Sequence, residues 1–111
     1  MSNVIPIWPE LPKQLSREDA AKLVAEVLAD SANVQWSDHV LERMYERDIT
    51  DMQVLQVMRR GTVVTDPKFG SYRNWEVSME AHTAGDHVRV GLAIDANKLG
   101  FYVVVITTIH L

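Results

Sequence analysis

The 111-residue chain has no cysteine and no long apolar run. Without cysteine, a disulfide framework, a thiolate metal site and a thiol nucleophile are all excluded. No stretch approaches the roughly 18 apolar residues that a membrane-spanning helix requires. The first residues also lack the basic flank and apolar core of a secretory signal. We therefore expect a cytoplasmic protein that does not cross a membrane.

Basic residues are also few. Eleven Lys and Arg stand against fifteen Asp and Glu, which gives a net charge of −4. A chain of this balance is not expected to bind nucleic acid over its whole surface, because phosphate binding needs clustered Lys and Arg. A local basic patch is still compatible with the charge, and it would consist mainly of arginine.

Three of the four prolines fall in residues 1–15, where they favour an extended arm over a helix. We expect Trp8 in this arm to pack on the domain itself, the alternative being a partner protein. A hydrophobic content of 47% suits one domain with a single core. We divide it into the arm at 1–15, a helical part at 16–61 and an antiparallel sheet at 62–111.

The helical part contains three predicted helices. Ser16, Ser37 and Thr50 are good N-cap residues, and each precedes apolar residues at helical spacing. Thr50 and Gln53 have the form of a capping box. Gly61 suits the left-handed position that often ends a helix.

From Thr62 the apolar period changes from helical to two, which indicates strands. We predict strands at 62–65, 74–82, 87–95 and 101–111, with a loop at 68–72 and a hairpin turn at 83–86. The last strand is almost continuously apolar, which is typical of the sheet interior. The expected fold is α+β, with three N-terminal helices packed on one face of a four-stranded antiparallel sheet.

The second predicted helix carries the strongest candidate residues. At about 100° per residue, its apolar stripe centres near Val40 and Met44, and His39, Arg43 and Arg47 follow one border of that stripe. Packing would hold side chains there while letting them reach a cleft. A purely structural alternative is that the arginine stems cover the core edge and extend their charges into water.

Two segments, S-D-H-V-L-E-R-M-Y-E-R-D-I-T and V-L-Q-V-M-R-R-G-T-V-V, resemble the bacterial domain of unknown function 4258. The matching positions are His39, Arg43-Met44, Arg47-Asp48-Ile49, Gly61 and the closing triplet Thr108-Ile109-His110. The resemblance covers roughly residues 36–111. Asp48 stands where that family usually has glycine, and His110 stands where it has tyrosine.

That family is similar to the RelE/BrnT-like toxins of toxin–antitoxin modules, whose small α+β domains cleave RNA without a metal. The resemblance implies a RelE-like endoribonuclease that acts on RNA, needs no cofactor or metal, and has an antitoxin or other protein as partner. Such a reaction requires a base, an acid and cations that stabilise the phosphorane charge. The candidate catalytic residues are His39, Arg43, Arg47, Arg89 and His110, and the candidate substrate-binding residues are Arg73 and Thr108. Glu76 and Glu80 are alternative bases.

A second interpretation is a non-catalytic module that binds a protein through an exposed sheet face or the proline arm, and a homo-oligomer is compatible with either. If His82 faces His87 across the hairpin, Glu80 and Arg89 form an ordinary cross-strand ion pair. Convergence of the candidate residues in one cleft would favour the ribonuclease. Arginines that are each paired with a local carboxylate would favour the interaction module.

Overall fold

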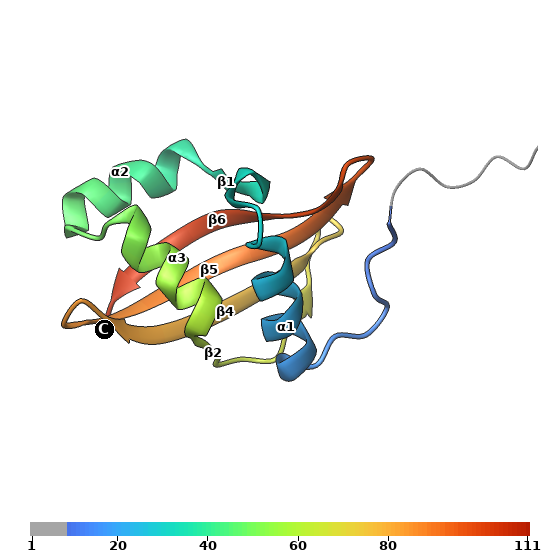
Figure 1. Cartoon of the computed structure of the whole chain (residues 1–111), viewed down its shortest axis with the longest axis horizontal. Coiled ribbons are helices and arrows are strands. Elements are labelled where there is room, and N and C mark those ends of the chain that lie inside the picture. The colour runs from blue at the N-terminus through green and yellow to red at the C-terminus, as the bar shows by residue number, and fades with distance from the viewer. Residues whose placement is uncertain (1–8) are drawn as a thin grey trace, which may run out of the picture.

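A computed structural model of the chain describes residues 9–111, so the prediction for Trp8 lies outside the described residues. Figure 1 shows its elements, which in chain order are the helices and strands α1 (Arg17–Val27), the 3-10 turn η1 (Ser31–Asn33), β1 (Val34–Trp36), α2 (Asp38–Arg47), α3 (Asp51–Arg60), β2 (Thr62–Val63), β3 (Lys68–Phe69), β4 (Trp75–Thr83), β5 (Asp86–Asn97) and β6 (Gly100–His110). The fold is therefore mixed α+β, as predicted. No helix in residues 9–111 has both the length and the apolar character needed to cross a membrane.

In the part of the chain that the structure describes, the sheet has six strands rather than the predicted four. Its order is β1-β6-β5-β4-β2, and β3 pairs with β4 off this path. The sheet is also not purely antiparallel, because β1 runs parallel to β6 with Val34 opposite Val103 and Trp36 opposite Val105. β1 and β3 have three and two residues. Runs this short show no apolar period, so sequence patterning could not reveal either strand.

The central hairpin agrees with the prediction. Ala84 and Gly85 have φ angles of 50° and 83°, as a two-residue turn with left-handed backbone requires. His82 faces His87 across it, and Glu80 faces Arg89. The register of β5 and β6 shifts at Gly91/Leu92, because Leu92 is opposite Val105 while Gly91 is opposite Thr107. Ile106 is thus an extra residue in β6, a β-bulge.

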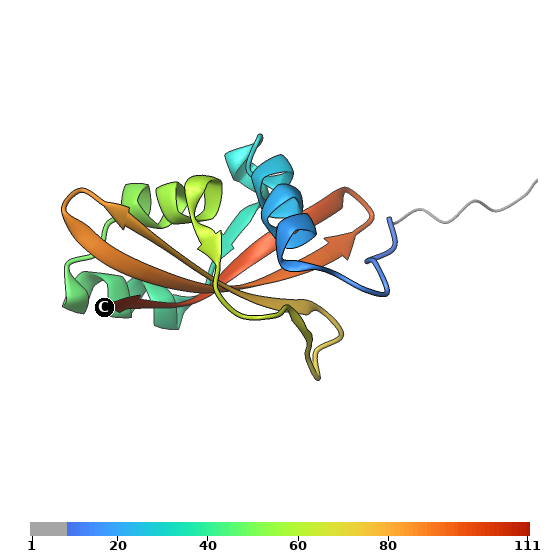
Figure 2. The same cartoon turned by 90° about the horizontal axis from the view of Figure 1, so that it is seen from below.

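The helices do not all cover one face. α1 and α3 lie over one face of the sheet, whereas α2 lies along β6 at the edge that the short β1 leaves uncovered (Figures 1 and 2). The main core forms under α1 and α3, with Val54, Val57 and Met58 buried against apolar residues of β4 and β5. Between those core positions, polar residues of β4 and β5 face the side of the sheet opposite α3.

The three predicted N-caps are confirmed. The hydroxyl groups of Ser16, Ser37 and Thr50 accept from backbone N–H groups three residues later, and Thr50 and Gln53 complete the capping box. The prediction for Gly61 was wrong, because its φ is −75° rather than left-handed. It is glycine for lack of space: a Cβ there would lie 2.3 Å from the Val57 carbonyl oxygen and 2.7 Å from that of Glu80.

Candidate functional site

α2 carries the predicted line of His39, Arg43 and Arg47. His39 is exposed, and its Nε2 lies 3.4 Å from the Nε of Arg43 as the acceptor of a long hydrogen bond. An imidazole can accept there only when Nε2 carries no proton. The Nη1 atom of Arg43 lies 3.6 Å from a carboxylate oxygen of Glu46. Arg43 thus has only loose local partners, both on its own helix.

Arg47 connects α2 to the sheet. Its Nη1 atom donates to the carbonyl oxygen of Thr108 in β6. β1 pairs with Val103–Val105, so within residues 9–111 no strand pairs with β6 on this side at Thr108. Arg47 replaces that missing strand as a hydrogen-bond donor, which satisfies and protects the sheet edge. The same contact brings its guanidinium group to the C-terminal end of β6.

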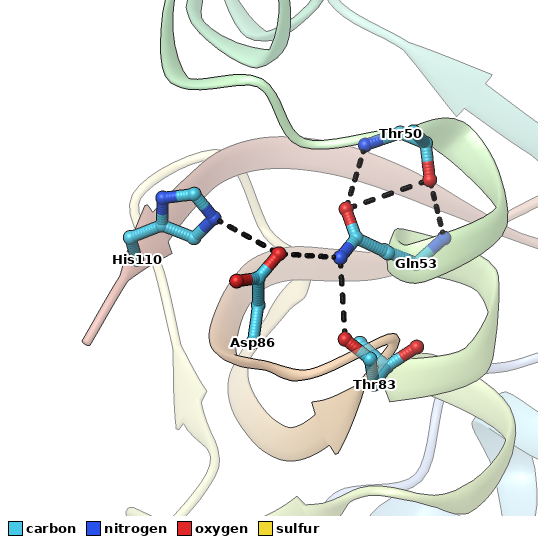
Figure 3. Close-up of polar contacts among 5 residues, drawn as sticks. All are labelled: Thr50, Gln53, Thr83, Asp86 and His110. Atoms are coloured by element: carbon cyan, nitrogen blue, oxygen red, sulfur yellow. Dashed lines mark hydrogen bonds and ion pairs between the residues drawn. The ribbon is translucent and has the colours of Figure 1, made fainter.

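His110 lies at that end of β6 in a polar cluster (Figure 3). Its Nε2 atom lies 3.7 Å from Oδ2 of Asp86. Val88 is directly opposite His110 in the sheet, and Asp86 lies two residues before Val88, so Asp86 and His110 are diagonal neighbours on one face. Gln53 of α3 donates to the same Oδ2 atom at 2.9 Å and to the Thr83 carbonyl at 3.2 Å.

Thr108 contacts Arg47 through its backbone carbonyl group and not through its side chain. Its side chain is 0% exposed, and within the described residues its hydroxyl oxygen has no hydrogen-bond partner. The carbonyl group that contacts Arg47 is therefore the part of Thr108 that lies at the β6 edge. We name the set His39, Arg43, Arg47, Asp86 and His110 the β6 edge site.

The expected convergence in one cleft is not observed for Arg89 and Arg73, which the structure does not bring to the β6 edge site. Arg43 and Arg89 are each paired with a local carboxylate, as the interaction module predicts. Arg89 points to the opposite face of the sheet, where its Nε donates to Glu80 at 2.6 Å and its Nη2 forms an ion pair with the same carboxylate. Glu80 also contacts His87 Nε2 at 3.1 Å, and His87 stacks on His82 with ring centroids 4.2 Å apart. Arg73 lies in the loop before β4, a full strand length away from the 83–86 turn.

Of the alternative bases, Glu80 is held by this ion-pair cluster, and Glu76 lies beside Gly70. A Cβ on Gly70 would be 2.0 Å from Oε2 of Glu76. The residues from 9 to 111 contain no group of three or more His, Cys, Asp or Glu side chains that could hold a metal ion.

Sequence reasoning missed Asp86 and the second role of Gln53. Gln53 was identified as a capping residue, but not as a donor to Asp86. Asp86 reads as an ordinary turn residue. Neither contact has a local signal in the sequence, because each joins segments that only the folded sheet brings together.

Comparison with known families agrees with the resemblance seen in the sequence. A family model described as Domain of unknown function (DUF4258) matches residues 36–110, which include all three helical residues of the β6 edge site together with Asp86 and His110. Searches of curated proteins and of solved structures found no match. The matched segment spans α2 to the end of β6 and more than half of the chain, and the chain therefore belongs to the DUF4258 family.

Proposed function

We propose that this chain is a RelE-like, toxin-type endoribonuclease that cleaves RNA without a metal at the β6 edge site. One observation carries the proposal: α2 is fixed to the edge of β6 by the Arg47–Thr108 contact. This contact gives residues from distant parts of the chain a common edge, with Arg47 beside the end of β6 that carries His110. Arg43 and His39 follow one and two helical turns back along α2.

The residue types suit metal-independent cleavage. One imidazole, of His110 or His39, would take the proton of the 2′-hydroxyl as that oxygen attacks phosphorus. The imidazolium formed in this way, or a water molecule, would protonate the departing 5′-oxygen. Arg43 and Arg47 would bind the phosphate oxygens, since guanidinium groups match their geometry.

Both arginines can provide donors. An exposed ion pair at 3.6 Å, such as Arg43–Glu46, contributes little, so a phosphate can displace Glu46. Arg47 has five N–H donors, of which one is bonded to Thr108.

Inducible expression in bacteria tests the proposal. We expect the wild type to slow growth and fragment cellular RNA, and Arg43→Ala or His39→Ala to restore both. Arg59→Ala is the matched control, because Arg59 is an exposed residue at the end of α3, away from the site. Equal growth of the wild type and the two site variants, with intact RNA, would contradict the proposal.

A second function, protein binding without catalysis, is favoured by a different face of α2. Leu41 and Tyr45 lie one turn apart and are 49% and 80% exposed, with Asp38 and Glu42 exposed beside them. Large apolar side chains flanked by acids suit a partner that presents apolar side chains flanked by bases. Arg89 is also neutralised by Glu80, which leaves it little to offer RNA.

Co-purification after bacterial expression tests this second function. A partner held by this face would stay with the wild type and with the control Glu76→Gln, and it would be lost from Leu41→Ser/Tyr45→Ser. Recovery of the same partner by all three proteins would contradict binding through Leu41 and Tyr45. Mass measurement by light scattering shows whether that partner is a second copy of the chain.

A further inference from the structure

We propose that Asp86 is a positioning residue for His110, and that Gln53 holds Asp86 in place for this task. The catalytic meaning of the pair rests on the proposed ribonuclease function. The pairing itself does not, because it follows from the contacts around Gln53.

The orientation of the Gln53 amide is set by its partners. Its Oε1 atom accepts from the backbone N–H of Thr50 at 3.0 Å, and a backbone N–H can only donate. The Nε2 group must therefore face the other way, where it donates to the Thr83 carbonyl at 3.2 Å and to Asp86 at 2.9 Å. Because Gln53 is only 5% exposed, water cannot readily replace these partners.

Asp86 is consequently held between a fixed donor and His110. Its Oδ2 atom receives the Gln53 hydrogen bond and lies 3.7 Å from His110 Nε2. That separation is long for a hydrogen bond, and the side chains of His110 and Asp86 are 40% and 44% exposed, so this ion pair differs from Arg43–Glu46 chiefly in that Gln53 fixes its carboxylate. Catalytic contacts often shorten when substrate binds. Figure 3 shows the Nε2 corner of the imidazole turned toward Asp86 and the other ring nitrogen turned away.

This geometry assigns different tasks to the two nitrogens of His110. A proton on Nε2 faces the carboxylate, so Nδ1 is the atom that can accept or donate a proton outside the cluster. Asp86 would stabilise the imidazolium formed when Nδ1 takes a proton, without touching the substrate. A carboxylate that orients a histidine in a catalytic triad has the same effect.

The other charged groups near this end of the sheet are engaged elsewhere. Arg47 donates to the Thr108 carbonyl. His87 and Arg89 point to the opposite face and share Glu80. In the part of the chain that the structure describes, Asp86 is the carboxylate in ionic contact with His110.

A double-mutant cycle tests the pairing without RNA. Urea unfolding would be measured for the wild type, Asp86→Asn, His110→Gln and the double variant at pH 5 and pH 9. Asparagine keeps an acceptor for Gln53 but removes the charge. A histidine is ordinarily charged at pH 5. There we expect the decrease in the urea midpoint of the double variant to be smaller than the sum of the decreases in the two single variants. At pH 9 the losses should add.

The control cycle pairs Asp86→Asn with His39→Gln, which do not contact each other and should give additive losses at both pH values. Additive losses for Asp86 and His110 at pH 5 would overturn the proposal.

An RNA assay then separates positioning from mere stability. With a single-stranded RNA oligonucleotide, we expect Asp86→Asn to lower kcat by at least about tenfold with KM unchanged, and Asp86→Glu to recover part of the loss. The double variant should be no slower than His110→Gln alone. A change in KM alone would overturn the positioning role. Intact RNA with the wild type, together with coupling in the unfolding cycle, would reject the ribonuclease and support the pairing.

Discussion

At the scale of single residues, the corner between α2 and α3 puts Asp48 in a conformation that favours glycine. Asp48 has φ 57° and ψ 40°, the left-handed conformation. Its N–H and that of Ile49 bond to carbonyl groups in the last turn of α2, at Tyr45 and Met44, and the buried Ile49 and Met44 both belong to the core. These are the features of a Schellman motif, in which glycine is the usual left-handed residue.

Asp48→Gly is therefore expected to raise the free energy of unfolding by about 0.5–1 kcal/mol, because glycine adopts positive φ without steric cost. Urea denaturation measures the change. The matched control is Asp51→Gly, three residues later in the first turn of α3, which should lower stability by a similar amount because that position is helical. A loss of stability in Asp48→Gly would contradict the argument.

Tyr102 has a pKa above its usual value. Burial raises the pKa of Tyr102 above its usual 10.0, and the charge of Asp95 and a hydrogen bond to it raise it further. Asp95 is directly opposite Tyr102 in the β5–β6 pair. Because the folded pKa lies above the unfolded one, the contribution to stability is present below about pH 10. It is lost as the pH rises toward and through the higher folded pKa.

Asp95→Asn should lower the pKa of Tyr102 while leaving it raised, since burial remains. The fall in stability at alkaline pH should become smaller. Ultraviolet titration of the phenolate reports the pKa in a Tyr45→Phe/Tyr72→Phe background, where both removed tyrosines are exposed. Asp66→Asn, a distant acid, is the control. An unchanged Tyr102 titration in Asp95→Asn would exclude Asp95 as a cause.

At the scale of elements, α2 replaces a missing strand at the edge of β6. We expect Arg47→Ala to lower the free energy of unfolding by about 1–2 kcal/mol, because a charged donor to the Thr108 carbonyl is removed from a partly buried edge. Arg43→Ala, one turn earlier and in loose contact with exposed His39 and Glu46, should change it by less than about 0.5 kcal/mol. Urea denaturation of both variants checks the contrast, and equal losses would refute an edge role for Arg47.

Features that depend on neighbouring residues, such as helix starts, could be predicted from the sequence, whereas contacts between distant elements could not. Ser16, Ser37 and Thr50 marked the helix starts because a cap is a contact within one turn. The prediction of a left-handed Gly61 was wrong because the group that requires glycine there, the Glu80 carbonyl, belongs to another element. The pairing of β1 with β6 also had no signal, since three residues cannot show a period.

The bulge at Ile106 is the decisive element that the sequence pattern hides. Strict alternation from Val103 and Val105 would put Thr107 and Ile109 on the core face, and Thr108 and His110 on the other. The extra residue exchanges these faces, so that Thr108 is opposite Val90 and His110 opposite Val88. His110 therefore lies on the same face as Asp86 because of one inserted residue. The line on α2 was predictable, whereas the Asp86–His110 pair was not.

At the scale of the whole molecule, a net charge of −4 limits how RNA can be held. Under the proposed function, binding relies on Arg43 and Arg47 of the β6 edge site, whereas Arg89 is neutralised by Glu80. Two phosphate contacts, from Arg43 and Arg47, predict that log K for single-stranded RNA falls with log salt at a slope of about −1.4.

Fluorescence anisotropy of a labelled single-stranded RNA oligonucleotide, measured over a series of salt concentrations, gives this slope. Arg43→Ala should make it shallower by about 0.7, because one phosphate contact is lost. Arg59→Ala/Arg60→Ala, at the exposed end of α3, should leave it unchanged. A slope that responds to Arg59 and Arg60 but not to Arg43 would locate RNA on α3, and the β6 edge site would then need a different ligand.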